Sequence, residues 1–185
     1  MKYCIRTKSR GWVLKPTSKW DEKKRFNNRI SGRSDSYYEK CPATRRSVSG
    51  YNVKLEGAVV IVASGKQKKT TLSVTESETV SGVTCAQNML YAKNVMSSIN
   101  LEVESPIILE MDNQGGVDMA KRRACNEKTE HMQVREMWLS ELNEKGIIKL
   151  KWISDDNTET NIQSKYLAGP LCEKHTKVYC GDDEC

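Results

Sequence analysis

The chain has 185 residues, a formal net charge of +6 at pH 7 and 37% hydrophobic residues, which suits one domain of ordinary size with a real core. It contains no run of about 18 apolar residues and no apolar segment near its start, so we expect neither a membrane span nor a signal peptide. The seven cysteines are an odd number and include no Cys-x-x-Cys pair. This usage favours a reduced, intracellular protein that is not secreted.

Positive charge is concentrated in the first part of the chain. Residues 1–70 hold 18 Lys/Arg and 5 Asp/Glu, whereas the remaining residues hold 12 and 19. A basic segment suits phosphate binding, because lysine and arginine contacts release counterions from a nucleic acid. Charge alone, however, favours the plainer alternative of a solvated basic face.

The chain begins with residues 1–25, which we expect to be an irregular linker from an upstream region. A first strand starts at Phe26, and its alternation puts Ile30 and Ser34 on one side and Asp35 on the other. The basic, serine-rich surroundings of Asp35 make this carboxylate a candidate functional residue.

Two further strands follow. Residues 47–55 and 58–63 are rich in Val and Ile and are joined by Glu56-Gly57, which predicts an antiparallel hairpin with a two-residue turn. The first three strands are therefore expected to form an antiparallel meander.

Residues 73–100 are predicted to form a long helix. Its inward stripe, in steps of three and four, is Val74, Glu78, Gly82, Cys85, Met89, Ala92 and Met96. A lone carboxylate on a buried face costs free energy unless a positive group meets it. The helix alone favours a core glutamate bonded to a basic side chain, and a metal ligand is the alternative.

A buried strand at 107–111 ends at Asp112, which glycines follow. A carboxylate at the carboxyl end of a central strand is where α/β folds place chemistry, although an aspartate there caps the next helix equally well.

The last predicted elements are a short helix at 117–123, a helix at 129–145 that Gly146 ends, a strand at 147–153 and a short helix at 155–165. The longer helix is expected to turn Val134, Trp138 and Leu142 inward. Residues 166–185 are expected to form a C-terminal tail without regular structure. The whole order predicts an α/β fold with a mixed five-stranded sheet flanked by helices.

In this topology the first and fourth strands can lie side by side, with the long helix packed across them. Asp35, Glu78 and Asp112 would then converge, and a divalent cation would relieve their mutual repulsion. Hard oxygen ligands select Mg²⁺ or Mn²⁺.

Several segments carry one family's motifs in order and at compatible spacing. They are GRSDSYY at 32–38, RRSVSGY at 45–51, QKKTTLSVTESE at 67–78, DNQGG at 112–116, KTEH at 128–131 and TNIQSK at 160–165. From about Gly11 to at least Lys165, the chain resembles the ribonuclease H domain that ends copia-type LTR retrotransposon polyproteins.

The resemblance implies a ribonuclease H-like domain over residues 26–165 that hydrolyses the RNA strand of RNA–DNA hybrids with two Mg²⁺ or Mn²⁺ ions. The family's catalytic positions fall on Asp35, Glu78, Asp112 and Asn161, of which the three acids would be the metal ligands. Glu78 is preferred to Glu76 because it aligns with the family's helix carboxylate.

The same resemblance implies further contacts and partners. Arg45, Arg46 and Lys68 are candidates for contacts to the nucleic-acid backbone, and His131 is expected to order the start of its helix. The expected partners are the hybrid and the reverse transcriptase region of a parent polyprotein, of which this chain would be a monomeric C-terminal fragment. No membrane is expected to take part.

The sequence departs from the family's pattern where the fourth acid is expected. Asn161 offers a carbonyl oxygen but no charge, and this loss should weaken the second ion most. Tyr37, Gly116 and Glu130 also replace usual residues. The alternative hypothesis is therefore a catalytically degenerate relic that binds nucleic acid or has no selected activity.

The C-terminal tail contains a spacing that is close to that of a zinc knuckle. Cys172, His175, Cys180 and Cys185 have suitable intervals, but Cys and His are exchanged in the middle positions. The glycine and aromatic residues of such a motif are absent, so coincidence is the favoured interpretation.

Overall fold

The computed structural model describes residues 11–15, 28–38, 43–112, 114, 117, 130–154 and 158–180. Its elements are β1 (Ile30–Tyr37), β2 (Val48–Leu55), β3 (Ala58–Lys66), α2 (Val74–Ser98), β4 (Ile107–Met111), α4 (Glu130–Glu144), β5 (Ile148–Trp152), α5 (Asn161–Ser164) and α6 (Gly169–Cys180). The expected strand start at Phe26, most of the linker and most of the helix at 117–123 lie outside the described residues.

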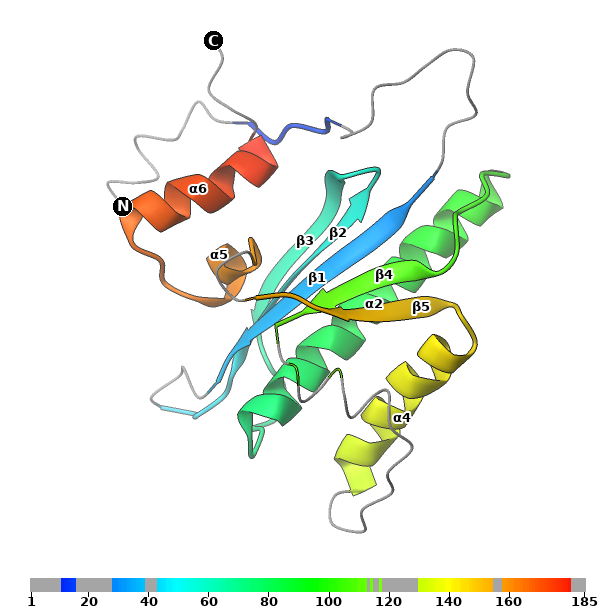
Figure 1. The fold of residues 1–185 in the computed structure, drawn as a ribbon. Coiled ribbons are helices and arrows are strands. Elements are labelled where there is room, and N and C mark those ends of the chain that lie inside the picture. Colours follow the sequence, from blue (N-terminus) through cyan, green and yellow to red (C-terminus); the bar gives the residue numbers. More distant parts are fainter. Residues whose placement is uncertain are drawn as a thin grey trace.

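The strands form one sheet in the order β3-β2-β1-β4-β5 (Figure 1). Strands β1, β2 and β3 pair antiparallel, while β4 pairs parallel with both β1 and β5. This arrangement confirms the mixed five-stranded sheet and the expected place of β4 beside β1.

The β2–β3 hairpin turns at the two residues that the sequence indicated. Glu56 and Gly57 have φ angles of 50° and 85°, the left-handed pair that a two-residue hairpin turn requires. The Glu56 carboxylate also accepts a hydrogen bond from the Arg29 backbone N–H at 2.8 Å. This bond joins the turn to the start of β1.

Helix α2 begins at a capped N-terminus. The Ser73 hydroxyl accepts a hydrogen bond from the Glu76 backbone N–H at 3.1 Å, and the Glu76 carboxylate accepts one from the Leu72 N–H at 2.7 Å. These reciprocal bonds satisfy helix donors that would otherwise have no partner. Glu76 therefore serves the helix end, and Glu78 is the acid that turns toward the sheet.

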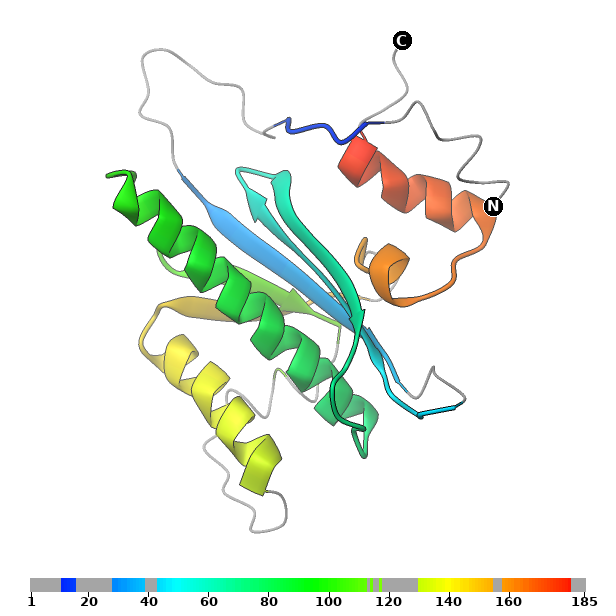
Figure 2. The same cartoon turned by 180° about the vertical axis from the view of Figure 1, so that it is seen from behind.

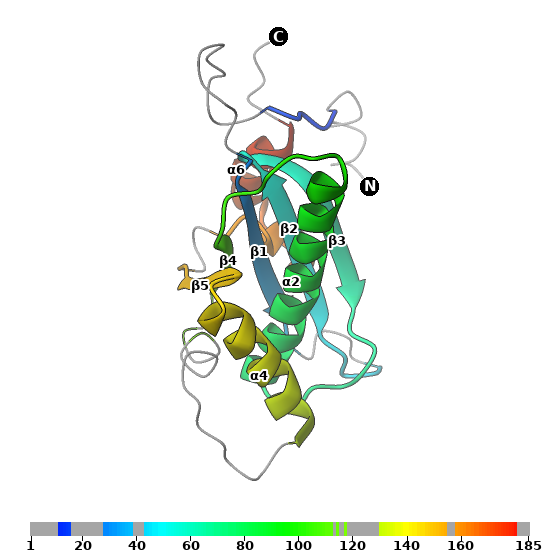
Figure 3. The same cartoon turned by 90° about the vertical axis from the view of Figure 1, so that its right-hand side faces the viewer.

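The sheet separates two layers of helices. Helices α2 and α4 cover one face, and the shorter α5 and α6 lie against the other (Figures 2 and 3). The core between the sheet and α2 is built around residues that include Val53, Cys85, Met89, Leu109 and Ile148. No helix in the described part of the chain combines the length and apolar character that crossing a membrane requires.

The inward face of α4 differs from the predicted one. Leu142 is buried and Trp138 packs against the core, but Val134 is 66% exposed and Leu139 is buried in its place. Successive steps of four advance the side chain by about 40° around a helix of 3.6 residues per turn. Val134 has therefore left the face that Leu142 shares with Leu139.

The end of the chain is more regular than predicted. Helix α5 covers only Asn161–Ser164, and the expectation of an irregular tail is wrong for Gly169–Cys180, which form α6. Gly169 and Pro170 are the first two residues of α6, and proline is tolerated in the first turn of a helix. The Tyr179 hydroxyl accepts a hydrogen bond from the Asn52 side chain at 3.0 Å, which ties α6 to the sheet.

Candidate metal centre

Three carboxylates meet at the carboxyl ends of β1 and β4. Ser34 pairs with Met111 in the parallel register of these strands, so Asp35 and Asp112 follow at the same level on adjacent strands. Glu78 reaches them from the second turn of α2. One oxygen from each of the three side chains lies within 4.8 Å of the others, so the predicted convergence is observed.

Glu78 is held in place by β1. Its Oε1 accepts hydrogen bonds from the Ser36 backbone N–H at 2.9 Å and from the Ser36 hydroxyl at 2.7 Å. The side chain is almost fully buried, and its Oε2 accepts no hydrogen bond from any residue that the structure describes. A buried, orphaned carboxylate oxygen is costly unless a cation or a donor meets it.

The cluster resists full ionisation without a cation. Burial, followed by the charges of Asp112 and Asp35, raises the pKa of Glu78 well above its usual value. Burial also raises the pKa of Asp35 to about 6, although the Lys165 ammonium and the Ser164 hydroxyl act in the opposite direction. Neighbouring carboxylates of this kind favour a bound cation.

Two residues of the 160–165 motif, for which no role was predicted, complete the surroundings of Asp35. The Lys165 Nζ lies 3.2 Å from Asp35 Oδ1, and the Ser164 hydroxyl donates a hydrogen bond to Asp35 Oδ2. Gly50 is the β2 partner of Asp35. A Cβ on Gly50 would lie 3.0 Å from the Ser164 backbone nitrogen, so only glycine leaves room for α5 here.

Asn161 occupies the first turn of α5, one helical turn before Ser164 and Lys165. It is 4% exposed. The segment that carries the fourth catalytic position therefore does lie over the sheet beside Asp35, but Asn161 brings an amide where the family's pattern has a carboxylate.

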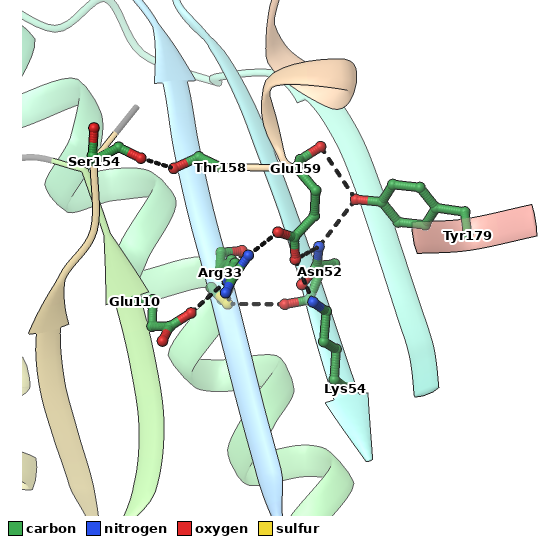
Figure 4. Close-up of polar contacts among 9 residues, drawn as sticks. Arg33, Asn52, Lys54, Glu110, Ser154, Thr158, Glu159 and Tyr179 are labelled. Atoms are coloured by element: carbon green, nitrogen blue, oxygen red, sulfur yellow. Dashed lines mark hydrogen bonds and ion pairs between the residues drawn. The ribbon is translucent and has the colours of Figure 1, made fainter. Parts of the chain in front are cut away.

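Glu159 is the acid nearest in sequence to Asn161, and it is committed to another cluster (Figure 4). Its carboxylate pairs with the Lys54 ammonium at 2.5 Å and with the Arg33 guanidinium, and it accepts a hydrogen bond from Asn52 at 3.2 Å. Burial alone would raise the pKa of Glu159, but Lys54 and Arg33 outweigh burial and leave this pKa below its usual value.

Glu159 therefore cannot supply the missing fourth carboxylate. The sequence contained one signal for its cluster. Arg33 and Asp35 alternate with small residues on β1, which marks a second polar face of that strand.

The candidate nucleic-acid contacts lie at the same end of the sheet. Val48, the first residue of β2, pairs with Tyr37 at the end of β1 and with Lys66 at the end of β3. Arg45 and Arg46 come just before this level and Lys68 just after it, and all three are exposed.

Other predicted residues fall outside the described part of the molecule or outside the cluster. The His131 side chain and Cys185 lie outside the described residues. Cys172, His175 and Cys180 lie on α6, and among the described residues they form no group that could hold a metal ion.

Comparison with known sequences gives an informative match. No protein-family model matches the chain. Over 121 residues it is 25% identical to the retrovirus-related Pol polyprotein from transposon TNT 1-94 of Nicotiana tabacum, which is a copia-type element. The match covers 65% of this chain and 9% of the polyprotein.

Comparison with solved structures defines the fold. The N-terminal RNase H domain of a Mycobacterium tuberculosis protein, solved as a fusion with maltose binding protein, superposes with a TM-score of 0.53 and 9% identity, covering 82% of this chain and 98% of that one. LC11-RNase H1, isolated from compost, was solved with an RNA/DNA hybrid and superposes with a TM-score of 0.52 and 10% identity, covering 74% and 94%.

The chain therefore has a ribonuclease H-like fold. Its sequence is similar to part of a copia-type retrotransposon Pol polyprotein, as the motifs indicated.

Proposed function

We propose that the chain is a retrotransposon-derived ribonuclease H that hydrolyses the RNA strand of RNA–DNA hybrids with Mg²⁺ or Mn²⁺. The observation that carries this proposal is the convergence of Asp35, Glu78 and Asp112 at one end of the sheet. The similarity to a Pol polyprotein supports the origin. A hybrid bound to a protein of the same fold supports the substrate.

The three carboxylates fit a divalent cation. Their oxygens are the hard ligands that Mg²⁺ and Mn²⁺ prefer, and Glu78 Oε2 is a buried acceptor without a described donor. A bound ion would supply activation of the attacking water and charge stabilisation of the leaving 3′ oxygen. The protein itself would shield the acids from solvent and keep them in fixed positions. The two hydrogen bonds from Ser36 fix the position of Glu78.

The basic residues at this end of the sheet would position the substrate. Arg45, Arg46 and Lys68 are exposed beside the end of β1, where they would contact phosphates flanking the scissile bond. Such contacts set the register of a nucleic acid without reading its sequence. The chain would act inside the cell, next to the reverse transcriptase region of its polyprotein.

A cleavage assay tests this function. End-labelled RNA–DNA hybrid is incubated with the protein and Mg²⁺ or Mn²⁺, in parallel with single-stranded RNA, duplex RNA and duplex DNA. We expect metal-dependent cleavage of the hybrid RNA strand alone, and we expect Asp35→Asn to abolish it. Glu141→Gln is a matched control, because Glu141 lies on α4 in an exposed ion pair with Lys145 and is not one of the three clustered acids.

The second candidate function is a degenerate relic that binds nucleic acid without cutting it. The neutral Asn161 at the fourth catalytic position is the observation that favours it. In that case the unaltered chain would bind hybrid in a strongly salt-dependent way, Asp35→Asn would bind equally well, and neither would cut. Gain of cleavage in Asn161→Asp would then identify an inactive enzyme with an intact scaffold.

A further inference from the structure

A chain of buried polar side chains leads from the loop after β3 to the candidate metal centre. Gln67 is buried, and its side-chain nitrogen donates hydrogen bonds to the Ser77 carbonyl at 2.9 Å and to the Ser49 hydroxyl at 2.9 Å. The same nitrogen lies 3.4 Å from the Ser77 hydroxyl. That hydroxyl is 2.6 Å from the Ser36 hydroxyl, which donates to Glu78 Oε1 at 2.7 Å. Gln67 is thus connected to one of the three clustered carboxylates.

The Ser77 carbonyl fixes the orientation of the Gln67 amide. A carbonyl oxygen only accepts hydrogen bonds, so the Gln67 atom that faces it must be the nitrogen. The other amide atom, Oε1, is buried and meets no donor among the described residues. The nitrogen therefore presents a hydrogen to the Ser77 hydroxyl as well, and that hydroxyl cannot direct its own proton toward Gln67.

The direction of the remaining hydrogen bonds follows from counting protons. Each hydroxyl has one proton to donate. The Ser77 proton goes to the Ser36 oxygen, and the Ser36 proton is then left for Glu78 Oε1, which also accepts from the Ser36 backbone N–H. Hydrogen bonds that run in one direction polarise one another, so the chain strengthens its last bond, the one to Glu78.

Without the Gln67 amide a second arrangement becomes available. A serine in a helix can donate to the carbonyl four residues before it, which for Ser77 is the carbonyl of Ser73. The Ser77 oxygen would then accept the Ser36 proton, and Glu78 Oε1 would keep only its bond to the backbone. The carboxylate would be free to rotate away from the other two acids.

We infer that Gln67 is a positioning residue of the metal centre, which acts through Ser77 and Ser36 on Glu78. Its amide keeps Glu78 Oε1 bonded to β1 and leaves Oε2, which meets no described donor, available to a cation. The inference deepens the proposed function and rests on it. It also gives a role to the first residue of the segment 67–78, which the three acids alone leave unexplained.

Mn²⁺ binding to the full chain, measured by calorimetry below the melting temperature of each variant, tests the inference. Gln67→Met keeps the length of the side chain but removes the amide. We expect it to weaken Mn²⁺ binding at least about tenfold, as the loss of a group that orients a metal ligand typically does. Thr71→Val is the matched control, because Thr71 is buried in the same loop and its bond to Ser47 at 3.1 Å does not lead to Glu78. It should bind Mn²⁺ as the natural chain does.

A comparison in a second background separates positioning from general support of the fold. Ser77→Ala removes the alternative acceptor of the Ser36 proton, so adding Gln67→Met to it should change the Mn²⁺ affinity by less than about twofold. If Gln67 only tied the loop to α2, the loss would be the same in both backgrounds, because the bonds to the Ser77 carbonyl and to Ser49 disappear in both. Gln67→Leu, which also lacks the donor, replaces Gln67→Met in both backgrounds if the latter does not fold.

The outcomes distinguish this inference from the proposed function. Equal losses of Mn²⁺ affinity in the two backgrounds, or an unchanged affinity in Gln67→Met alone, would overturn the role of Gln67 and leave the proposed nuclease standing. Absence of any bound Mn²⁺ in the natural chain would overturn both.

Discussion

At the scale of single residues, the same carboxylates that suit a metal destabilise the protein without one. Glu78 illustrates this, because it is buried beside two other acids and one of its oxygens has no described donor. Its position is fixed by Ser36. Binding energy from an ion would be required to offset the cost of keeping these charges together.

Glu78→Gln should therefore stabilise the metal-free protein. The pKa of Glu78 is raised to about 9, so folding at pH 7 must protonate this carboxyl at a free-energy cost that an amide does not have. The amide oxygen can still accept the Ser36 hydrogen bonds, so we expect a gain of about 1–3 kcal/mol at pH 7. Urea unfolding without metal measures it. Glu76→Gln is the control and should lose about 0.5–1 kcal/mol, because Glu76 serves the start of α2. Equal losses in both variants would refute the account.

Glu159 makes the opposite kind of contribution. Its pKa is lower in the folded protein than its usual value, because Lys54 and Arg33 outweigh the effect of burial. A depressed carboxyl pKa adds stability at pH values above the pKa of the unfolded chain. That stability disappears as the pH falls through the folded pKa.

Glu159→Gln should thus cost about 2–4 kcal/mol at pH 7, because it leaves the partly buried Lys54 ammonium without the carboxylate it pairs with and leaves Arg33 with Glu110 as its remaining ion-pair partner. The difference from the natural chain should shrink as the pH falls below about 4.3, where glutamates become protonated. Urea unfolding across the pH range measures this. The exposed Glu141→Gln should change stability by less than about 0.5 kcal/mol, and a pH-independent cost at Glu159 would rule the charge explanation out.

At the scale of elements, the short helix α5 is the piece that completes the site. It is only four residues long, so its own hydrogen bonds cannot hold it in place. Its position depends on Gly50 beneath it and on the buried Glu159 before it. This explains why the local sequence pattern predicted a short helix here but predicted neither its boundaries nor its contact with Asp35.

Gly50→Ala should push α5 away from the sheet. The added Cβ would lie 2.8 Å from the Gln163 Cβ and 3.0 Å from the Ser164 nitrogen, and overpacking of this kind costs about 1–3 kcal/mol. The melting temperature and the Mn²⁺ affinity should both fall. Gly65→Ala, on the neighbouring β3 with open space at its Cβ, should leave both unchanged. If Gly50→Ala behaves like Gly65→Ala, the close contact is not required.

Helix α6 docks on the opposite side of the sheet from α2 through polar contacts. The Tyr179 ring meets Trp12 edge to face at a centroid distance of 6.4 Å, and the Trp12 indole N–H donates to the Val59 carbonyl at 2.9 Å. Burial raises the pKa of Tyr179 to about 12, so its hydroxyl stays protonated at pH 7.

Tyr179→Phe should leave Asn52 without one of its buried partners and cost about 1 kcal/mol. Denaturant unfolding measures this loss of stability, and hydrogen exchange of the α6 amides should show faster local opening. Tyr166→Phe is the matched control, because Tyr166 is 89% exposed. Unchanged exchange in Tyr179→Phe would show that this bond does not secure the helix.

At the scale of the whole molecule, the sequence predicted the sheet, α2 and the meeting of three acids, because these follow from periodicity, turn residues and strand order. It missed the contacts of Lys165 and Ser164 with Asp35, and the ion pairs of Glu159 with Lys54 and Arg33. Those contacts join residues more than a hundred positions apart. No local pattern reports such a pairing.

Helix α6 shows the same limit in another form. Its residues were expected to be irregular, yet they form a helix that docks through Tyr179. Tertiary packing overrides weak local propensity in such a segment. The prediction that Val134 faces inward was wrong for a different reason. The helix itself was predicted, but the face that it turns toward the core was not predicted correctly.

The most direct test of the account is the Mn²⁺ affinity of the natural chain and of three single variants, Asp35→Asn, Glu78→Gln and Asp112→Asn. If the three side chains bind one ion together, each variant should weaken binding at least about tenfold, a loss of about 1.4 kcal/mol, while Glu141→Gln should bind as the natural chain does. Unchanged affinity in any of the three would contradict a shared metal centre.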